Sequence, residues 1–264
     1  MEGSTSQSWL QNGLKILVLA RHVPDSNLLL PLKQGVPDYS AFSWVLNPFD
    51  EVATEAAVQL RQQFKEQHPD LPAEVIIVGR AGSAGTAAVE RALSLGGDRA
   101  LLLSEAEEPQ IFLAQLIEQI REIAPHLVLL GRMALGEEKG ELAGQLAGTL
   151  DWPLATAVSE LVLENQALNF LQRRITQSRH ASLPLPAIVS AELDLAIPRY
   201  VTLPALVAAR RKPKQMCAPV SADTETEIAV MPENWQSPPT RQTGCKVNDV
   251  HELLARLAEQ GVFL

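Results

Sequence analysis

The stretch EVIIVGRAGSAGTAAVERALSLGGDRALLLSE, residues 74–105, contains a complete strand–helix–strand unit. Its two ends, EVIIVGR and RALLLSE, each contain an unbroken apolar run, VIIV and ALLL, which is typical of parallel strands whose two faces are covered by helices. Between them, Ser83 to Leu95 carries apolar side chains at helical spacing. Because such units join parallel strands through a crossover helix, the stretch predicts an α/β fold.

The same alternation continues on both sides of that unit. LKILVLA at residues 14–20 and HLVLLGR at 126–132 are further apolar runs of strand length, and Asp50 to Gln67 and Pro109 to Ile123 have helical spacing. We therefore expect a doubly wound, mostly parallel sheet of the Rossmann-like type.

The pattern changes after residue 152. Three shorter β-like runs, at residues 157–163, 167–176 and 187–191, are predicted to add antiparallel strands to the edge of the sheet. From Pro198 the chain is rich in proline, residues 216–243 hold few apolar side chains, and a final helix is predicted near Val247 to Glu259. An arm of this kind, without a core of its own, is either disordered or wrapped on a partner.

These patterns divide the chain into three parts. We expect a flexible N-terminal extension at residues 1–13, an α/β domain at 14–197, and a proline-rich segment with a C-terminal arm at 198–264.

The composition argues against several kinds of partner. A formal net charge of -9 at pH 7 disfavours nucleic acid, because phosphate binding relies on clustered Lys and Arg. No apolar stretch is long enough to span a bilayer and no secretory leader is recognisable, so we expect a cytoplasmic protein without direct membrane insertion. Cys217 and Cys245 lack neighbours at zinc-ligand spacing, so no metal site is predicted.

Three blocks of sequence resemble the electron transfer flavoprotein beta subunit, and they occur in the order typical of that family. They are LNPFDEVATEAAVQL at residues 46–60, DLAIPRYVTLPALVAARRKP at 194–213 and SPPTRQTGCKVNDVHELLARL at 237–257. The resemblance implies a subunit without catalytic residues that forms a heterodimer with a larger alpha subunit. In it, residues 14–197 would be the nucleotide-binding domain, and residues 198–264 the recognition segment and the C-terminal arm that contacts the alpha subunit. FAD would be held mainly by the alpha subunit and would carry electrons from flavin dehydrogenases toward a membrane quinone oxidoreductase.

The resemblance also implies an adenine nucleotide, commonly AMP, at the carboxyl ends of the strands, in agreement with the crevice rule for open α/β sheets. Free N–H groups at helix N-termini are the physical reason for a phosphate to bind there. The residues carried over to this site are Leu19, Asn47, Pro48, Phe49, Asp50, Arg80, Gly131, Arg132, Met133, Ala134, Leu135, Gly136, Glu137, Glu138 and Ala143.

The loop GEEKGELAGQ at residues 136–145 departs from the family pattern, in which this stretch ends Asn-Gln-Thr-Gly. Carboxylates at a helix start repel a phosphate unless they are paired. Either the basic residues bind phosphate while the glutamates reach the ribose or adenine, or the charges satisfy one another and the site is altered or empty. Electron-bifurcating members hold a second FAD in this subunit, and their loop usually carries Asp-Gly-Asp and Ala-Gln. Because that motif is absent from residues 136–145 too, a second FAD ranks below AMP.

A second site implied by the resemblance is a recognition loop that docks on partner dehydrogenases. Its residues are Pro198, Arg199, Tyr200, Leu203 and Pro204. Leu203 is either an exposed anchor for a pocket on the partner or a core residue. The bracketing prolines would restrict the free loop, and Arg210, Arg211 and Lys212 could steer an acidic surface toward it.

Two other features leave alternatives open. Arg174 replaces a family glutamate that faces the alpha subunit, and it either reverses a contact charge or is simply an exposed strand residue. For the whole chain, the alternative function is a stand-alone adenine-nucleotide-binding protein of the same fold without a redox role. The long C-terminal arm favours the heterodimer subunit.

Overall fold

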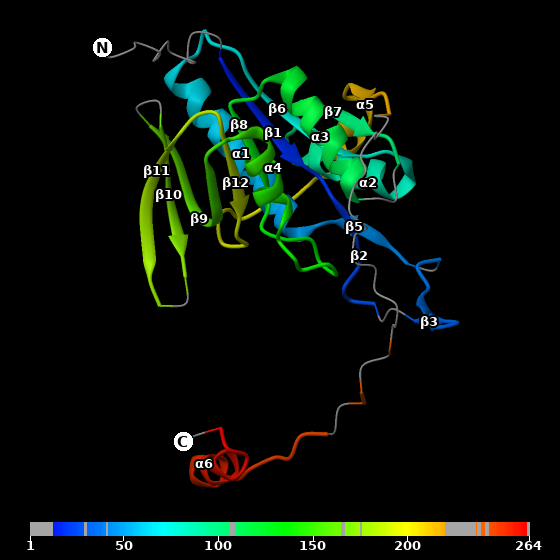
Figure 1. The fold of residues 1–264 in the computed structure, drawn as a ribbon, viewed down its shortest axis with the longest axis vertical. Coiled ribbons are helices and arrows are strands. Elements are labelled where there is room, and N and C mark those ends of the chain that lie inside the picture. The colour runs from blue at the N-terminus through cyan, green and yellow to red at the C-terminus, as the bar shows by residue number, and fades with distance from the viewer. Residues whose placement is uncertain are drawn as a thin grey trace. The chain divides into compact units, whose positions relative to one another are not determined.

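The computed structural model describes residues 13–28, 31–40, 42–105, 109–164, 167–174, 176–219, 236, 239–240 and 243–262. Within them lies a nine-stranded sheet in the order β11-β10-β9-β12-β8-β1-β6-β7-β13 (Figure 1). The strands of this sheet are β1 (Leu14–Leu19), β6 (Ala73–Arg80), β7 (Arg99–Leu103), β8 (Leu127–Gly131), β9 (Leu154–Glu164), β10 (Ala167–Arg173), β11 (Ser178–Pro184), β12 (Ala187–Ala191) and β13 (Lys214–Met216).

The helices and the short outer strands complete the element list. The helices are α1 (Pro48–Gln67), α2 (Gly82–Leu95), α3 (Pro109–Ile123), α4 (Leu142–Leu150), α5 (Leu203–Arg211) and α6 (Val250–Glu259). The strands β2 (His22–Pro24) and β5 (Trp44–Leu46) pair with each other, as do β3 (Leu32–Lys33) and β4 (Val36–Pro37).

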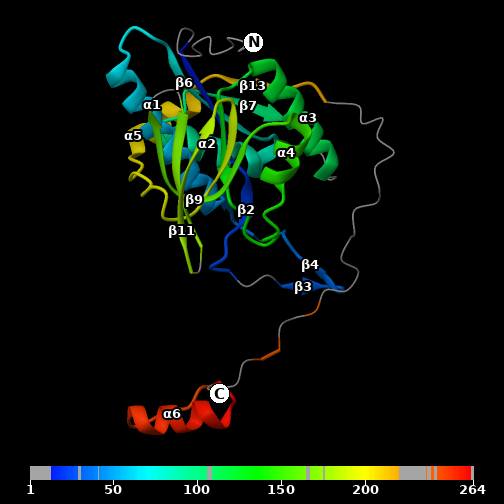
Figure 2. The same cartoon turned by 60° about the vertical axis from the view of Figure 1, so that its left-hand side comes forward.

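The central strands are parallel and are covered on both faces, as the apolar runs predicted. Ile16 and Val18 of β1 pack into the cluster formed with α1, α2 and α5, whereas Leu17 and Leu19 pack into the cluster formed with α3 and α4. Figure 2 shows α1 and α5 on one side of the sheet and α3 and α4 on the other. Successive side chains of a strand point to opposite faces, so an unbroken apolar run supplies both cores.

The predicted antiparallel edge is confirmed for two of the three runs and is wrong for the third. β9, β10 and β11 form an antiparallel meander at one end of the sheet. The run at Ala187–Ala191, however, forms β12, which lies inside the sheet and pairs in parallel with both β8 and β9. All five of its residues are buried, and only an interior strand is covered on both faces in this way.

The contacts between residues divide the chain into two compact units. One comprises Met1–Leu29 and Tyr39–Ala229, and the other comprises Leu30–Asp38 and Val230–Leu264. In the second unit, α6 begins three residues later than predicted, because the Asp249 carboxylate accepts a hydrogen bond from Glu252 N at 2.8 Å and caps the helix there. The predicted N-terminal extension and most of residues 220–242 lie outside the described residues.

None of the helices in the described part of the chain combines the length and the apolar character that crossing a bilayer requires.

Candidate functional site

The carboxyl ends of the central strands and the starts of three helices meet at one edge of the sheet, which we call the carboxyl edge. The strands β1, β6 and β8 end there at Leu19, Arg80 and Gly131, and α1, α2 and α4 begin in the segments that follow. Ligands of open parallel sheets bind at such an edge, because helix N-termini expose free N–H groups toward it.

Asp50, in the first turn of α1, is the centre of a charge network at this edge. Its side chain is fully buried, and its Oδ1 accepts a hydrogen bond from Gly131 N at 2.7 Å. Arg21 donates from Nε to Asp50 Oδ2 at 2.8 Å and from Nη2 to Oδ1 at 2.7 Å. Arg21 Nη2 also donates to the carbonyl oxygens of Gly131 and Met133. The network therefore joins α1 to the ends of β1 and β8.

The packing around this ion pair is close. A Cβ atom at Gly131 would lie 2.8 Å from Asp50 Oδ1 and against Phe49, so glycine is required where α1 meets β8. Burial lowers the pKa of Arg21, but the charge and hydrogen bonds of Asp50 outweigh burial, and the pKa lies above its ordinary value. Arg21 is therefore held as a cation.

Asn47, immediately before α1, organises the loop that follows β8. Its Nδ2 donates to Met133 O at 2.9 Å, and its Oδ1 accepts from Leu135 N at 3.4 Å. The residue is fully buried, although no side-chain bond caps α1. Asn47 was predicted as a nucleotide ligand, and the structure shows both its amide atoms bonded to the chain's own backbone.

Two further arginines at the edge pack on aromatic rings. The Arg80 guanidinium lies 4.6 Å from the centre of the Phe112 ring. Arg132 lies 6.0 Å from the Phe49 ring and forms an ion pair with Glu192 at 3.1 Å. Burial lowers the pKa of Arg80, although the negative charge of Glu137 acts in the opposite direction.

Acidic side chains stand at the starts of α2 and α4. Glu105, after β7, places its carboxylate against Gly82, the first residue of α2. Glu137, Glu138 and Glu141 are exposed in the segment before α4, and Glu141 occupies the N-cap position. The carboxyl edge therefore carries cations and anions side by side.

The structure brings the predicted cofactor-binding residues together at this edge, with two exceptions. The side chains of Leu19 and Ala143 belong to the core cluster beneath the edge. Sequence reasoning missed Arg21, Phe112 and Glu105. Arg21 follows directly after a predicted strand, and this position could have indicated that it lies at the carboxyl edge. Phe112 and Glu105 reach the edge only because distant segments pack together.

The residues predicted as a recognition loop lie together in the segment Ile197–Pro204, which we call the docking segment after that prediction. Arg199 anchors it to α1: Nε and Nη2 donate to the Glu55 carboxylate at 2.8 and 2.9 Å. Glu55 is only 3 % exposed. Burial raises the pKa of Glu55, but hydrogen bonds from Arg199 and Gln59 outweigh burial, and the pKa lies below its ordinary value. The segment is thus tied to the main domain by a charged pair.

The apolar side chains of the docking segment point away from the core. Ile197 is 89 % exposed, Tyr200 is 91 % exposed and Leu203 is 74 % exposed. Thr202 caps α5 by accepting a hydrogen bond from Ala205 N at 3.4 Å, and Pro204 lies in the first turn of α5, where no intrahelical N–H bond is lost. Of the two alternatives for Leu203, the structure shows the exposed one.

The basic residues after the docking segment have separate roles. Lys212 Nζ donates to the carbonyl oxygens of Leu93 and Gly97, which fixes the end of α5 to the end of α2. Arg210 lies 3.7 Å from Glu90 but remains largely exposed. Arg210 and Arg211 are exposed, and their steering role stays a prediction, whereas Lys212 is used inside the domain.

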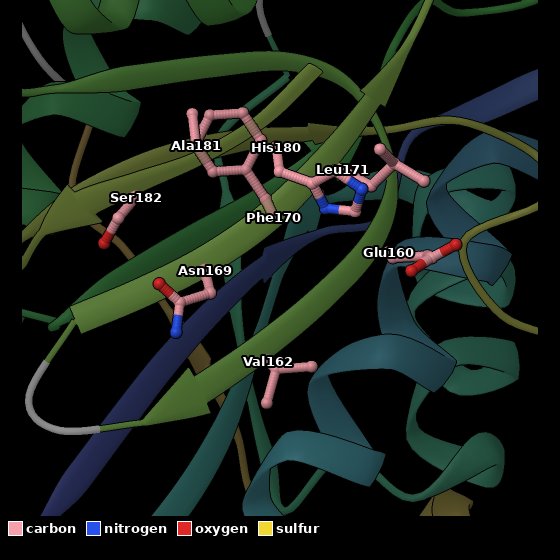
Figure 3. Close-up of a pocket in the computed structure, with 8 residues that line it drawn as sticks. All are labelled: Glu160, Val162, Asn169, Phe170, Leu171, His180, Ala181 and Ser182. Carbon is pink, nitrogen blue, oxygen red and sulfur yellow. The ribbon is translucent and has the colours of Figure 1, made fainter. Parts of the chain in front are cut away.

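The meander β9–β11 presents a hollow of about 410 Å³ on its outer face (Figure 3). It is lined by Glu160, Val162, Asn169, Phe170, Leu171, His180, Ala181 and Ser182. A second hollow of about 420 Å³ lies beside α3. Neither hollow is lined by the carboxyl-edge residues.

Arg174 follows β10 as an exposed residue, and its N–H donates to Gln177 O at 2.7 Å.

Comparison with known proteins identifies the family. Residues 40–221 match the family model of the electron transfer flavoprotein domain. The electron transfer flavoprotein subunit beta of Homo sapiens is 31% identical over 261 residues, which cover 94% of this chain and 98% of that protein. The subunit beta of Bradyrhizobium diazoefficiens is 28% identical over 254 residues, with 94% and 98% covered. The chain belongs to the electron transfer flavoprotein beta-subunit family.

The blocks that carried the resemblance lie in different parts of this beta subunit. Residues 47–51 begin α1 at the carboxyl edge, and Pro198–Pro204 falls in the docking segment. The third block, residues 237–257, lies partly outside the described residues and includes the start of α6. The family match therefore covers the carboxyl edge and the docking segment.

The carboxyl edge of this beta subunit fits AMP poorly. The side chains of Asn47 and Asp50 are fully buried and hydrogen-bonded within the chain. The exposed segment before α4 holds three carboxylates, of Glu137, Glu138 and Glu141, and one cation, Lys139, so its net charge is negative and disfavours a phosphate.

Proposed function

We propose that this chain is the beta subunit of a heterodimeric carrier that accepts electrons from flavin dehydrogenases. The electrons pass through FAD, held mainly by the alpha subunit, toward a membrane quinone oxidoreductase. The observation that carries the proposal is the docking segment, whose Ile197, Tyr200 and Leu203 are exposed on an anchored loop.

The geometry of the docking segment supports recognition of a protein partner. Exposed apolar groups cost free energy in water, and a cluster of them is a common sign of an interaction site. The Arg199–Glu55 pair and the two prolines restrict the segment before it binds, so less entropy is lost on docking. Arg210 and Arg211 on the adjoining helix add positive charge, which accelerates encounter with an acidic surface.

The C-terminal helix supports an alpha-subunit partner. None of the residues of α6 is buried, and Val250, Leu253 and Leu254 recur at helical spacing on it. Residues three and four apart lie on the same helical face, so these side chains form an apolar stripe. An amphipathic helix without a core of its own gains stability when a partner covers the stripe.

The direct test is co-expression of this chain with a candidate alpha subunit from the same source. We expect a one-to-one complex with a flavin absorption spectrum, reducible by a flavin dehydrogenase. A chain that remains a monodisperse monomer and binds no flavin in the presence of the alpha subunit would refute the proposal and favour the stand-alone nucleotide-binding protein.

The docking role is tested with Leu203→Ala in the same complex. We expect kcat/KM for reduction by the dehydrogenase to fall roughly tenfold or more, because interface hot spots contribute about 2 kcal/mol or more. The flavin content should stay unchanged. Val36→Ala, at another exposed apolar residue, serves as the matched control and should leave the rate unaltered; an equal loss in both variants would refute the docking role.

A further inference from the structure

Three helix N-termini at the carboxyl edge are each accompanied by a carboxylate of the chain itself. Asp50 lies in the first turn of α1, Glu105 lies against the first residue of α2, and Glu141 is the N-cap residue of α4. A helix N-terminus carries about half a positive charge, which a nearby carboxylate offsets. The groups that would attract a phosphate to this edge are therefore already compensated.

Three arginines at the edge are compensated as well, and Lys139, in the exposed segment before α4, is not one of them. Arg21 is bonded to Asp50 and to the carbonyl oxygens of Gly131 and Met133. Arg132 is paired with Glu192. Arg80 is packed on the Phe112 ring, and the negative charge of Glu137 acts on both Arg80 and Arg21.

The side-chain amide of Asn47 and the space in front of Gly131 are also occupied by the chain itself. Asn47 uses its amide nitrogen and oxygen to hold the backbone of Met133 and Leu135. Phe49 and Asp50 fill the space in front of Gly131, where a Cβ atom would collide with them. A nucleotide at this position would have to break these bonds and separate a buried ion pair, which is costly.

We infer that the carboxyl edge of this beta subunit is closed by its own charges, so that the heterodimer carries FAD as its only nucleotide cofactor. The inference deepens the proposed function by stating what the complex holds. The carboxylates of Asp50, Glu105 and Glu141 lie at the starts of α1, α2 and α4. They offset the positive partial charges of these helix N-termini, which a bound phosphate would offset in an open site.

The first experiment measures what the co-expressed complex carries. The purified heterodimer is denatured, and the released FAD and AMP are quantified by chromatography. We expect about one FAD per heterodimer and no AMP, with the recovered FAD as the internal control for release. One AMP, or a second FAD, per heterodimer would overturn the inference, whereas the absence of any FAD would instead count against the proposed function.

The second experiment tests the role of charge directly. AMP is titrated calorimetrically into the intact heterodimer, and we expect binding so weak that it does not saturate at millimolar concentration. In the double variant Glu105→Gln/Glu141→Gln we expect the affinity to rise about tenfold, because each charge at a helix terminus changes binding by a factor of about two to five. Micromolar binding by the unmodified complex would overturn the inference.

A matched control removes two acidic charges at the opposite edge of the sheet. Glu66 lies near the end of α1, and Asp70 lies in the turn before β6; both are exposed. The variant Glu66→Gln/Asp70→Asn should bind AMP as weakly as the unmodified complex does. Equal gains in both double variants, or no gain in Glu105→Gln/Glu141→Gln, would show that local charge compensation is not what closes the edge.

Discussion

Asp50 shows at the scale of one residue how burial changes the role of a side chain. From the sequence it was a helix-start acid and a predicted nucleotide ligand. In the structure, Arg21 lies 29 positions earlier in the chain and pairs with the fully buried Asp50, while the Arg21 side chain itself is 16% exposed. An unpaired charge in such a place is unfavourable, so each partner requires the other.

Replacement of Asp50 by Asn is therefore expected to lower the free energy of unfolding by about 3–5 kcal/mol, because Arg21 is left buried without a counter-charge. Urea denaturation followed by circular dichroism measures the change. Glu51→Gln is the control: the neighbouring Glu51 pairs with Arg91 at a partly exposed site, where loss of the pair costs about 1 kcal/mol or less. Similar losses in the two variants would contradict this account.

At the scale of elements, the docking segment depends on α1. Glu55 lies on the buried side of α1, and Arg199 reaches it from a loop 144 positions later. The bonds hold Tyr200 and Leu203 outward from a defined backbone position. Arg199 was predicted as a contact for a partner, and the structure gives its guanidinium a positioning role within the chain.

The variant Arg199→Met should reduce the rate of reduction by the dehydrogenase although Leu203 is intact, and should lower the free energy of unfolding by about 1–3 kcal/mol, because Glu55 loses its charged donors.

The pKa of folded Glu55 lies below the ordinary value of 4.5. The pair therefore contributes stability above pH 4.5, which is lost as the pH falls through the folded pKa. Arg199→Met should remove this acid sensitivity.

Arg173→Met is the control for that variant, since Arg173 pairs with Asp194 at an exposed site. It should change neither the stability nor the rate by a measurable amount. A variant Arg199→Met with the unmodified rate would show that the segment does not need its anchor.

Elements with a strong periodic pattern were predicted well, and elements without one were not. The strands β1, β6, β7 and β8 each contain an unbroken run of at least four apolar residues and were recognised from the sequence alone. β11, with the polar sequence SRHASLP, was missed because an exposed edge strand carries little hydrophobic signal. β12 was recognised as a strand but assigned to the wrong place, since periodicity does not report which neighbours a strand pairs with.

At the scale of the whole molecule, two histidines make stability depend on pH. The pKa of His22 lies below the ordinary value of 6.5 because of burial and the charge of Arg80, with Glu105 opposing. The pKa of His126 is lowered by burial and by Lys15, and its Nδ1 accepts a hydrogen bond from Lys15 N at 3.0 Å. The folded chain therefore resists protonation at both positions.

The sign of the effect follows from linkage. The unfolded chain protonates near pH 6.5, above the folded pKa values, so stability is complete above pH 6.5 and declines as the pH falls below it. Urea midpoints at pH 7.5, 6.5 and 5.5 should fall in that order. The double variant His22→Gln/His126→Asn should flatten the dependence, and a midpoint that rises toward pH 5.5 would contradict it.

The sequence by itself determined the α/β class, the main strands and helices, and the residues that carry the family resemblance, because each of these depends on local periodicity or on neighbouring residues. Only the tertiary structure decided that Arg21 pairs with Asp50, that Glu105 lies at the start of α2 and that Leu203 is exposed. Those facts depend on which distant segments pack together. Hydrogen-bond partners and burial are properties of that packing, and no spacing along the chain specifies them.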